Sequence, residues 1–124
     1  AFADDTFDLI LCSHVLEHIP DDAKAMQELF RVLKRGGWAI LQVPISGSLE
    51  NTFEDFNITE PHAREKFFGQ IDHVRIYGQD YPDRLRQAGF EVTVFDWTKD
   101  PDLNKKHPEK LGLHPDEKVF FCKK

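Results

Sequence analysis

Residues Phe7–Pro44, FDLILCSHVLEHIPDDAKAMQELFRVLKRGGWAILQVP, place one amphipathic segment between two apolar runs. The runs Phe7–Cys12 and Trp38–Val43 are short and almost continuously apolar, which is typical of strands covered on both faces in a parallel sheet. Between them, apolar residues spaced at i, i+3, i+4 and i+7 predict a helix; they are Met26, Leu29, Phe30 and Leu33. Strand, helix and strand in this order predict a βαβ unit with parallel strands, and therefore an α/β fold.

The ends of this helix also have sequence signals. Pro20 and then Asp21–Asp22 suit a helix start, since the carboxylates lie near the positive end of the helix dipole. Lys34–Arg35 suits the last turn, and Gly36–Gly37 offers a left-handed stop. We therefore expect the helix to extend to the glycine pair and the second strand to begin directly after it.

The middle of the chain is less regular. The stretch 44–77 is polar and rich in turn residues, apart from a short helix predicted at Pro61–Phe68. A loop of this length is seldom without a function. The stretch 78–88 then predicts a helix with Pro82 in its first turn and Gly89 as its stop.

Two further strands are predicted near the carboxyl terminus. Phe90–Trp97 alternates enough to form a strand with one wetter face, and Lys118–Cys122 is apolar. Between them, 98–116 contains three prolines among charged residues, which predicts a surface excursion with at most one helical turn.

The composition limits the class of protein. The chain has 124 residues, 40% of them hydrophobic, which suits one domain with its own core. Its net charge of −6 repels nucleic-acid phosphates, so no nucleic-acid partner is expected. No apolar run approaches the roughly 20 residues of a membrane helix, and no signal peptide is evident, so we expect a cytoplasmic protein without membrane contact. Cys12 and Cys122 are expected to be buried free thiols rather than a disulfide.

The stretch Phe7–Pro44 resembles the second half of a class I S-adenosylmethionine-dependent methyltransferase, of the methyltransferase type 11 kind. That family has a strand, a helix, an LKPGG turn and the next parallel strand in this order. Here Leu33–Gly37 reads LKRGG and departs from the family only at Arg35. The stretch 72–92, DHVRIYGQDYPDRLRQAGFEV, resembles the family's substrate loop, helix, AGF turn and sixth strand.

The resemblance implies an incomplete Rossmann-like methyltransferase sheet with flanking helices. It would contain the family's strands four to seven, and Lys118–Cys122 would be the seventh, antiparallel beside the sixth. The sequence has no G-x-G-x-G turn and no room for one ahead of Phe7. We therefore expect residues 1–124 to form a single domain, the C-terminal portion of a methyltransferase domain that lacks the Gly-rich cofactor motif.

The implied function is methyl transfer from S-adenosylmethionine to an unidentified acceptor, such as a small molecule. Because the principal cofactor motif is missing, the isolated chain is expected to bind the cofactor weakly and to be inactive. Ser13 and His14 end the first strand at the carboxyl edge, where open α/β sheets bind ligands, and the resemblance makes them cofactor-binding residues.

The resemblance also implies substrate residues, which are His18, His73, Arg75 and Tyr77. A structural role is the alternative for each of them. His18 would then cap or pack under the following helix, and the other three would belong to a loop held by local hydrogen bonds, with the tyrosine packed on the sheet. A histidine could act as a base only in a complete site, so no catalytic residue is assigned.

Two other functions are compatible with the sequence. Without a neighbouring strand, Phe7–Cys12 would form an exposed apolar sheet edge, which predicts a homodimer and allows a non-catalytic interaction domain. The segment 14–18, HVLEH, matches the H-x-x-E-H pattern of zinc hydrolases, which needs both histidines on one helical turn. A strand precedes this segment and Pro20 follows it, so we expect no such helix and no metal.

Overall fold

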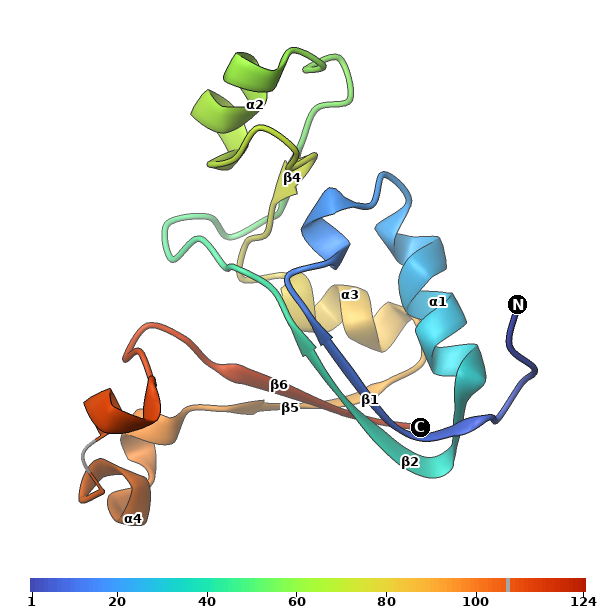
Figure 1. The fold of residues 1–124 in the computed structure, drawn as a ribbon, viewed down its shortest axis with the longest axis vertical. Helices are drawn as coiled ribbons and strands as arrows, with labels where there is room; N and C mark the ends of the chain where they lie inside the picture. The colour runs from blue at the N-terminus through green and yellow to red at the C-terminus, as the bar shows by residue number, and fades with distance from the viewer. Residues whose placement is uncertain (107) are drawn as a thin grey trace.

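The protein is described by a computed structural model over residues 1–106 and 108–124. A four-stranded sheet in the order β1, β2, β6, β5 forms its centre (Figure 1). The strands are β1 (Phe7–Ser13), β2 (Leu33–Gln42), β5 (Glu91–Phe95) and β6 (Val119–Lys123). β1 and β2 are parallel, whereas β6 is antiparallel to both β2 and β5. The predicted α/β class and the antiparallel last strand are therefore confirmed.

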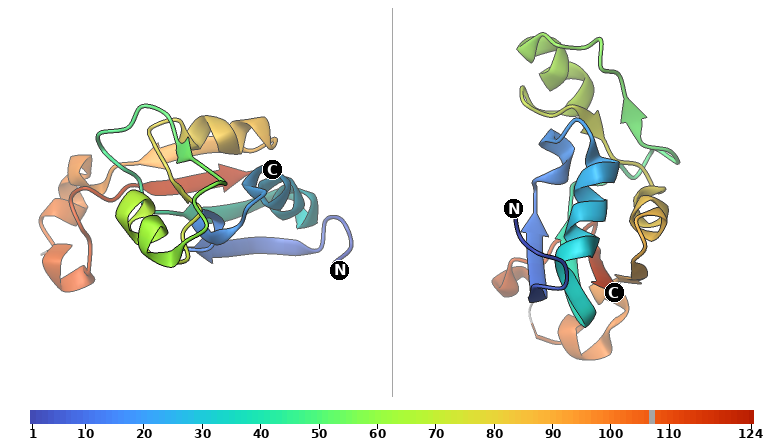
Figure 2. Two further views of the ribbon diagram at one scale, coloured as in Figure 1. Left: turned by 90° about the horizontal axis from the view of Figure 1, so that it is seen from above. Right: turned by 90° about the vertical axis from the view of Figure 1, so that its right-hand side faces the viewer.

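Two helices, α1 (Asp22–Val32) and α3 (Tyr81–Gln87), cover one face of this sheet. The parallel β1 and β2 flank α1 in sequence, as predicted for a βαβ unit (Figure 2). Side chains from the helices meet alternate residues of the inner strands, and together they form the buried core: Met26, Ala39, Leu41, Leu85, Phe120 and Cys122. Burial of these apolar groups is the main contribution to the stability of the domain.

The opposite face of the sheet carries exposed apolar side chains. The register aligns Leu9 with Trp38, and Leu11 with Ile40, across β1 and β2. Leu11 is 68% exposed. Both β1 and β5 are edge strands among the described residues, which agrees with the prediction that the first strand lacks a neighbour on one side.

The predicted end of α1 is wrong. The helix stops at Val32, and Leu33 is already extended, with φ of −74° and ψ of 132°. Leu33 is completely buried and pairs with Phe7 of β1. It therefore belongs to the strand, although its position in the sequence continues the helical spacing of apolar residues. Gly36 does have a left-handed φ of +79°, but it lies inside the extended segment rather than at a helix end.

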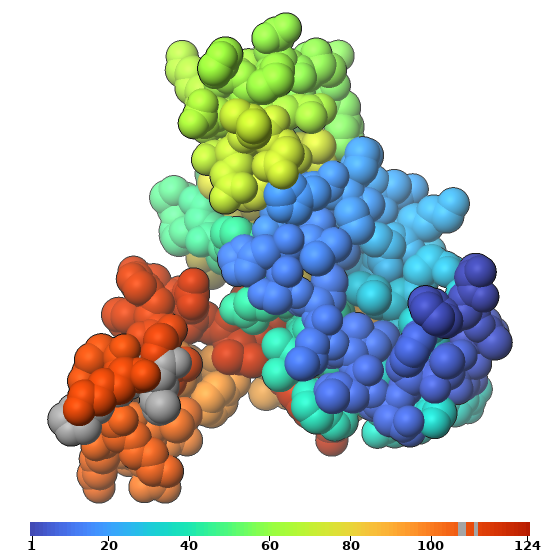
Figure 3. All heavy atoms as spheres, in the orientation of Figure 1, coloured from blue at the N-terminus to red at the C-terminus, as the bar shows by residue number. Residues whose placement is uncertain are grey.

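Two segments, 44–77 and 98–116, leave the sheet as excursions, and both contain more helices and strands than predicted. The helix α2 (Pro61–Phe68) has the predicted bounds, and a two-stranded pair was missed: β3 (Phe53–Glu54) with β4 (Arg75–Ile76). The second excursion, predicted to have at most one helical turn, contains η2 (Trp97–Lys99), α4 (Pro101–Asn104) and η3 (Pro108–Leu111). Figure 3 shows the two excursions as separate projections from the body.

The two cysteines and the absence of a membrane helix were also predicted from the sequence. Cys12 and Cys122 are free thiols; Cys122 is buried, whereas Cys12 is half-buried. None of the helices in the two described ranges combines the length and the apolar character that crossing a bilayer requires.

Candidate functional site

The turn after β1 begins at His14, where the chain leaves the sheet. The His14 N–H still donates to the carbonyl oxygen of Gln42 at 2.9 Å, but φ of His14 is +55°. Such a φ is uncommon for a residue with a side chain and is a feature of strained or functional positions. The short 3-10 helix η1 (Leu16–His18) follows. The prediction that no α-helix runs through His14–His18 is therefore confirmed.

A cavity of about 850 Å³ lies at this edge of the sheet. Its walls come from the end of β1, the end of β2 and the segment before β6, and they include His14, Gln42, Gly78, Asp96, His114 and Lys118. Ser13 instead lines a smaller cavity of about 360 Å³, together with Leu11 and Ile40 of the open sheet face. The structure thus places the two predicted cofactor residues in different cavities, and their predicted role itself stays a prediction.

Arg75 on β4 is buried, with 1% of its surface exposed, and it fixes the turn after β1. Its guanidinium donates to three carbonyl oxygens of that turn, at 2.9, 2.5 and 2.8 Å; they belong to Leu16, Ile19 and Pro20. Nε also donates to the Glu54 carboxylate at 2.7 Å. The guanidinium N–H groups are thus shared between backbone carbonyl oxygens and the half-buried Glu54 carboxylate, which gives Arg75 a supporting role in the turn.

A buried charge network joins this turn to α1 and α3. The Tyr77 hydroxyl donates to Asp22 at 2.7 Å, and Arg84 Nη2 donates to both oxygens of the same carboxylate at 2.8 and 2.9 Å. Arg84 also donates to Glu54 at 2.8 Å. Burial, and then the hydrogen bond to Asp22, raise the pKa of Tyr77 far above its usual value. Arg84 and Asp22 were not among the predicted residues, because pairing between distant elements leaves no local sequence signal.

These contacts engage four of the five guanidinium N–H groups of Arg75 and the hydroxyl of Tyr77. Tyr77 is fully buried, and its ring lies 4.8 Å from that of Tyr81 in the core. The arrangement corresponds to the structural alternative for both residues, a loop held by hydrogen bonds and a tyrosine packed on the sheet. Their role toward a substrate stays a prediction.

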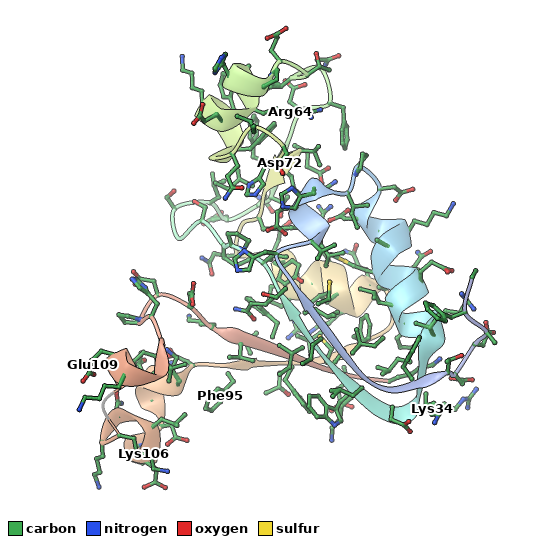
Figure 4. The ribbon with its side chains drawn as sticks, viewed as in Figure 1. Lys34, Arg64, Asp72, Phe95, Lys106 and Glu109 are labelled. Carbon is green, nitrogen blue, oxygen red and sulfur yellow. The ribbon has the colours of Figure 1, made fainter. Side chains whose placement is uncertain are left out.

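The two predicted histidines, His18 and His73, are brought together. Their rings lie 4.7 Å apart, edge to face, although they belong to segments far apart in the sequence. His73 Nδ1 lies 3.1 Å from the carbonyl oxygen of Phe68, and His18 Nδ1 lies 3.2 Å from Asp72 Oδ2. Figure 4 shows Asp72 beside the η1 turn. Glu17 lies against both histidines and is 2% exposed.

Comparisons with known proteins identify the class. A family model described as a methyltransferase domain matches residues 1–41. The chain is 43% identical over 77 residues to an uncharacterized protein of Methanocaldococcus jannaschii, a match that covers 60% of this chain and 33% of that protein. It is 30% identical over 107 residues to the ubiquinone/menaquinone biosynthesis C-methyltransferase UbiE of Vibrio campbellii, covering 76% of this chain and 41% of UbiE.

Solved structures share the fold. An S-adenosylmethionine-dependent methyltransferase from Mesorhizobium loti superposes with a TM-score of 0.58 at 17% identity, over 99% of this chain and 64% of that one. A second, from Thermotoga maritima, has a TM-score of 0.53 at 23% identity, over 99% and 59%. The chain belongs to the class I S-adenosylmethionine-dependent methyltransferase family. It spans 33% and 41% of the length of the two curated relatives named above.

The described residues fit the cofactor of this family only in part. A cradle for it needs backbone N–H groups of a Gly-rich turn at a helix start, and the turn after β1 contains no glycine. Gly47 and Gly78 do line the larger cavity. A Cβ atom on Gly78 would come within 2.6 Å of the Asn51 backbone, so this glycine is explained by close packing of two loops. Among the described residues, the larger cavity therefore has no Gly-rich turn at a helix start of the kind that a cofactor cradle needs.

Proposed function

We propose that residues 1–124 are the C-terminal portion of a methyltransferase domain that transfers a methyl group from S-adenosylmethionine to an acceptor. In this proposal β1, β2, β5 and β6 take the places of the family's fourth, fifth, sixth and seventh strands. The observation that carries the proposal is the sheet order, in which β6 lies antiparallel between β2 and β5 while β1 and β2 are parallel. The first three strands of the family would then continue the sheet from the free edge of β1.

His14 is the residue of this portion that we place nearest the reaction. The cofactor, when bound, supplies a methyl group on a sulfonium, and the enzyme chiefly aligns the two reactants. The His14 side chain is 56% exposed, and it lines the larger cavity. Of the histidines predicted to lie near the cofactor or the substrate, it is the one that could take a proton from an acidic acceptor, whereas the buried His73 lies under the turn. The acceptor is proposed only as a small molecule, because acceptor choice in this fold depends on the loops.

The incomplete cradle leads to a direct test. Calorimetric titration of the isolated chain with S-adenosylmethionine, or with its demethylated product, should give little or no heat of binding. Clear binding at micromolar concentration would show that the described residues suffice and would contradict the proposed division of the site. Coding sequence directly upstream that adds a strand and a G-x-G turn would support the proposal, and a chain completed in this way should bind the cofactor.

A second candidate function is a non-catalytic domain that works as a homodimer. The specific observation in its favour is the β1 edge, which pairs with no further strand in the described part of the chain and lies beside an exposed apolar sheet face, on which Leu9 and Leu11 are 44% and 68% exposed. Unpaired edges of this kind tend to pair with a second chain. A two-fold dimer through the β1 edge would cover it.

The expected cytoplasmic location also remains a prediction.

A further inference from the structure

We propose that the turn after β1 and the segment before β4 together form a binding site for a divalent transition metal ion, with Zn²⁺ as the preferred ion. The ligands are one carboxylate oxygen of Glu17 and one imidazole nitrogen each of His18 and His73. These three atoms lie within 4.8 Å of one another. Two imidazoles and one carboxylate are a ligand set that zinc uses when its fourth position stays open.

The Glu17 carboxylate is the observation that calls for a cation. It is 2% exposed, and neither of its oxygens has a hydrogen-bond partner among the described residues. His14 Nδ1 and His18 Nε2 lie 3.5 and 3.9 Å from Oε1, too far for a good hydrogen bond. A buried carboxylate without a partner is strongly disfavoured, and a bound metal ion removes this penalty.

Both histidines are oriented for metal binding by partners of their second ring nitrogen. A carbonyl oxygen can only accept, so the contact with Phe68 places a proton on His73 Nδ1 and leaves Nε2 free as a ligand. His18 Nδ1 faces the Asp72 carboxylate, which leaves His18 Nε2 directed toward Glu17. A carboxylate or carbonyl behind each ligating imidazole is the usual arrangement in metal sites, since it fixes the ring and raises its basicity.

The backbone around the ligands is held in place. The Val74 N–H donates to the carbonyl oxygen of Glu17 at 3.0 Å, and Arg75 binds the carbonyl oxygens of Leu16, Ile19 and Pro20. The two ligand-bearing segments are therefore fastened together on both sides of the cluster. Ligands about 2.1 Å from a tetrahedral ion lie about 3.4 Å apart, so binding needs only a small contraction of side chains.

This arrangement does not need the helix on which the H-x-x-E-H pattern depends. The prediction that the chain holds no metal rested on the missing helix through His14–His18, and His73 supplies the ligand that such a helix would have provided. Glu17 acts here as a ligand and not as a base, so the site does not make the chain a zinc hydrolase. The proposal is also independent of cofactor binding, since none of its ligands depends on the missing cradle.

Metal titration of the chelator-treated 124-residue chain tests the site. We expect one Zn²⁺ per chain, measured by competition with a chromophoric chelator, and a visible absorption band when Co²⁺ replaces zinc. Glu17→Gln and His73→Gln should each weaken binding at least tenfold and remove the Co²⁺ band. The matched control is His62→Gln on α2, whose imidazole is 93% exposed and should leave affinity unchanged.

If Glu17→Gln and His73→Gln do not fold, zinc binding by Asp72→Asn tests the site instead. The Asp72 side chain is 63% exposed, so its replacement should not disturb folding, but loss of the charge behind His18 should weaken zinc binding about 10-fold to 100-fold. Three results would each overturn the proposal. They are no stoichiometric zinc binding by the natural chain, unchanged affinity in folded His73→Gln, and equal weakening by His62→Gln.

Discussion

Arg75 Nη1 donates a hydrogen bond of 2.9 Å to the carbonyl oxygen of Leu16, 59 positions earlier in the chain. This bond connects β4, which lies in the long excursion, to the turn after β1, which lies at the carboxyl edge of the parallel strands. It also explains why that excursion returns to the body at this point. The backbone of the turn has few internal partners, and the guanidinium satisfies its carbonyl groups from outside.

Replacing Arg75 should therefore damage the fold severely. Arg75→Met removes the guanidinium donors from the carbonyl groups of the turn and leaves Arg84 as the remaining arginine partner of Glu54. We expect a loss of about 3–5 kcal/mol in the free energy of unfolding. Urea denaturation followed by circular dichroism measures this loss. Arg86→Met is the control, because Arg86 forms an exposed pair with Asp83 and should matter little. Similar stability of the two variants would contradict the role assigned to Arg75.

The two tyrosines should make the protein sensitive to alkali. Tyr77 and Tyr81 are the only tyrosines, both are fully buried, and burial raises the pKa of each well above its usual value. A pKa that is higher in the folded state gives stability that is complete below the unfolded pKa of about 10 and declines as the pH rises further. Tyrosinate absorbance in the near ultraviolet should therefore appear together with unfolding. Ionisation of either tyrosine in a protein that is still folded would contradict this expectation.

The two thiols should differ in reactivity. Burial raises the pKa of Cys122 to about 12, and it also raises the pKa of the half-buried Cys12. Because the thiolate is the reactive form, a chromogenic thiol reagent at neutral pH should modify Cys12 slowly and Cys122 only after denaturation. Cys12→Ser should abolish the slow reaction of the native protein. Rapid modification of two thiols per native chain would be inconsistent with the core described above.

Self-association should depend on the exposed side of β1. If the chain forms the proposed dimer, Leu11→Lys should shift it toward monomer and leave its stability to urea nearly unchanged, since the Leu11 side chain is largely exposed. Sedimentation equilibrium over a range of concentrations measures the effect. Lys66→Leu on α2, away from this edge, is a control that should not alter association. A natural chain that stays monomeric at every concentration would rule out the dimer.

The sequence was most informative where structure is set locally. The period of apolar residues and the helix start at Pro20 and Asp21–Asp22 predicted α1. In the structure Asp21 is its N-cap, and the Asp21 carboxylate accepts from the Lys24 N–H at 3.0 Å. The predicted bounds of α2, Pro61–Phe68, are correct; in the structure Pro61 lies at the helix start and Gly69 adopts the left-handed conformation at its end. The end of α1 was misjudged because pairing of Leu33 with β1 overrode its helical spacing.

The candidate sites needed the tertiary structure. The local pattern HVLEH contains two of the three proposed metal ligands, but nothing in it indicates His73, which only chain folding brings into contact. In the same way Arg75 and Tyr77 look like polar loop residues in the sequence, whereas their hydrogen bonds to Leu16 and Asp22 bury them.

The sequence by itself determined the α/β class, the parallel β1 and β2 pair and the membership in the methyltransferase family, because periodicity, caps and turn motifs act over a few neighbouring residues. Only the tertiary structure decided which polar side chains converge. Burial and charge pairing depend on contacts between distant segments, and the environment of Glu17, unpartnered among histidines from two such segments, follows from those contacts alone.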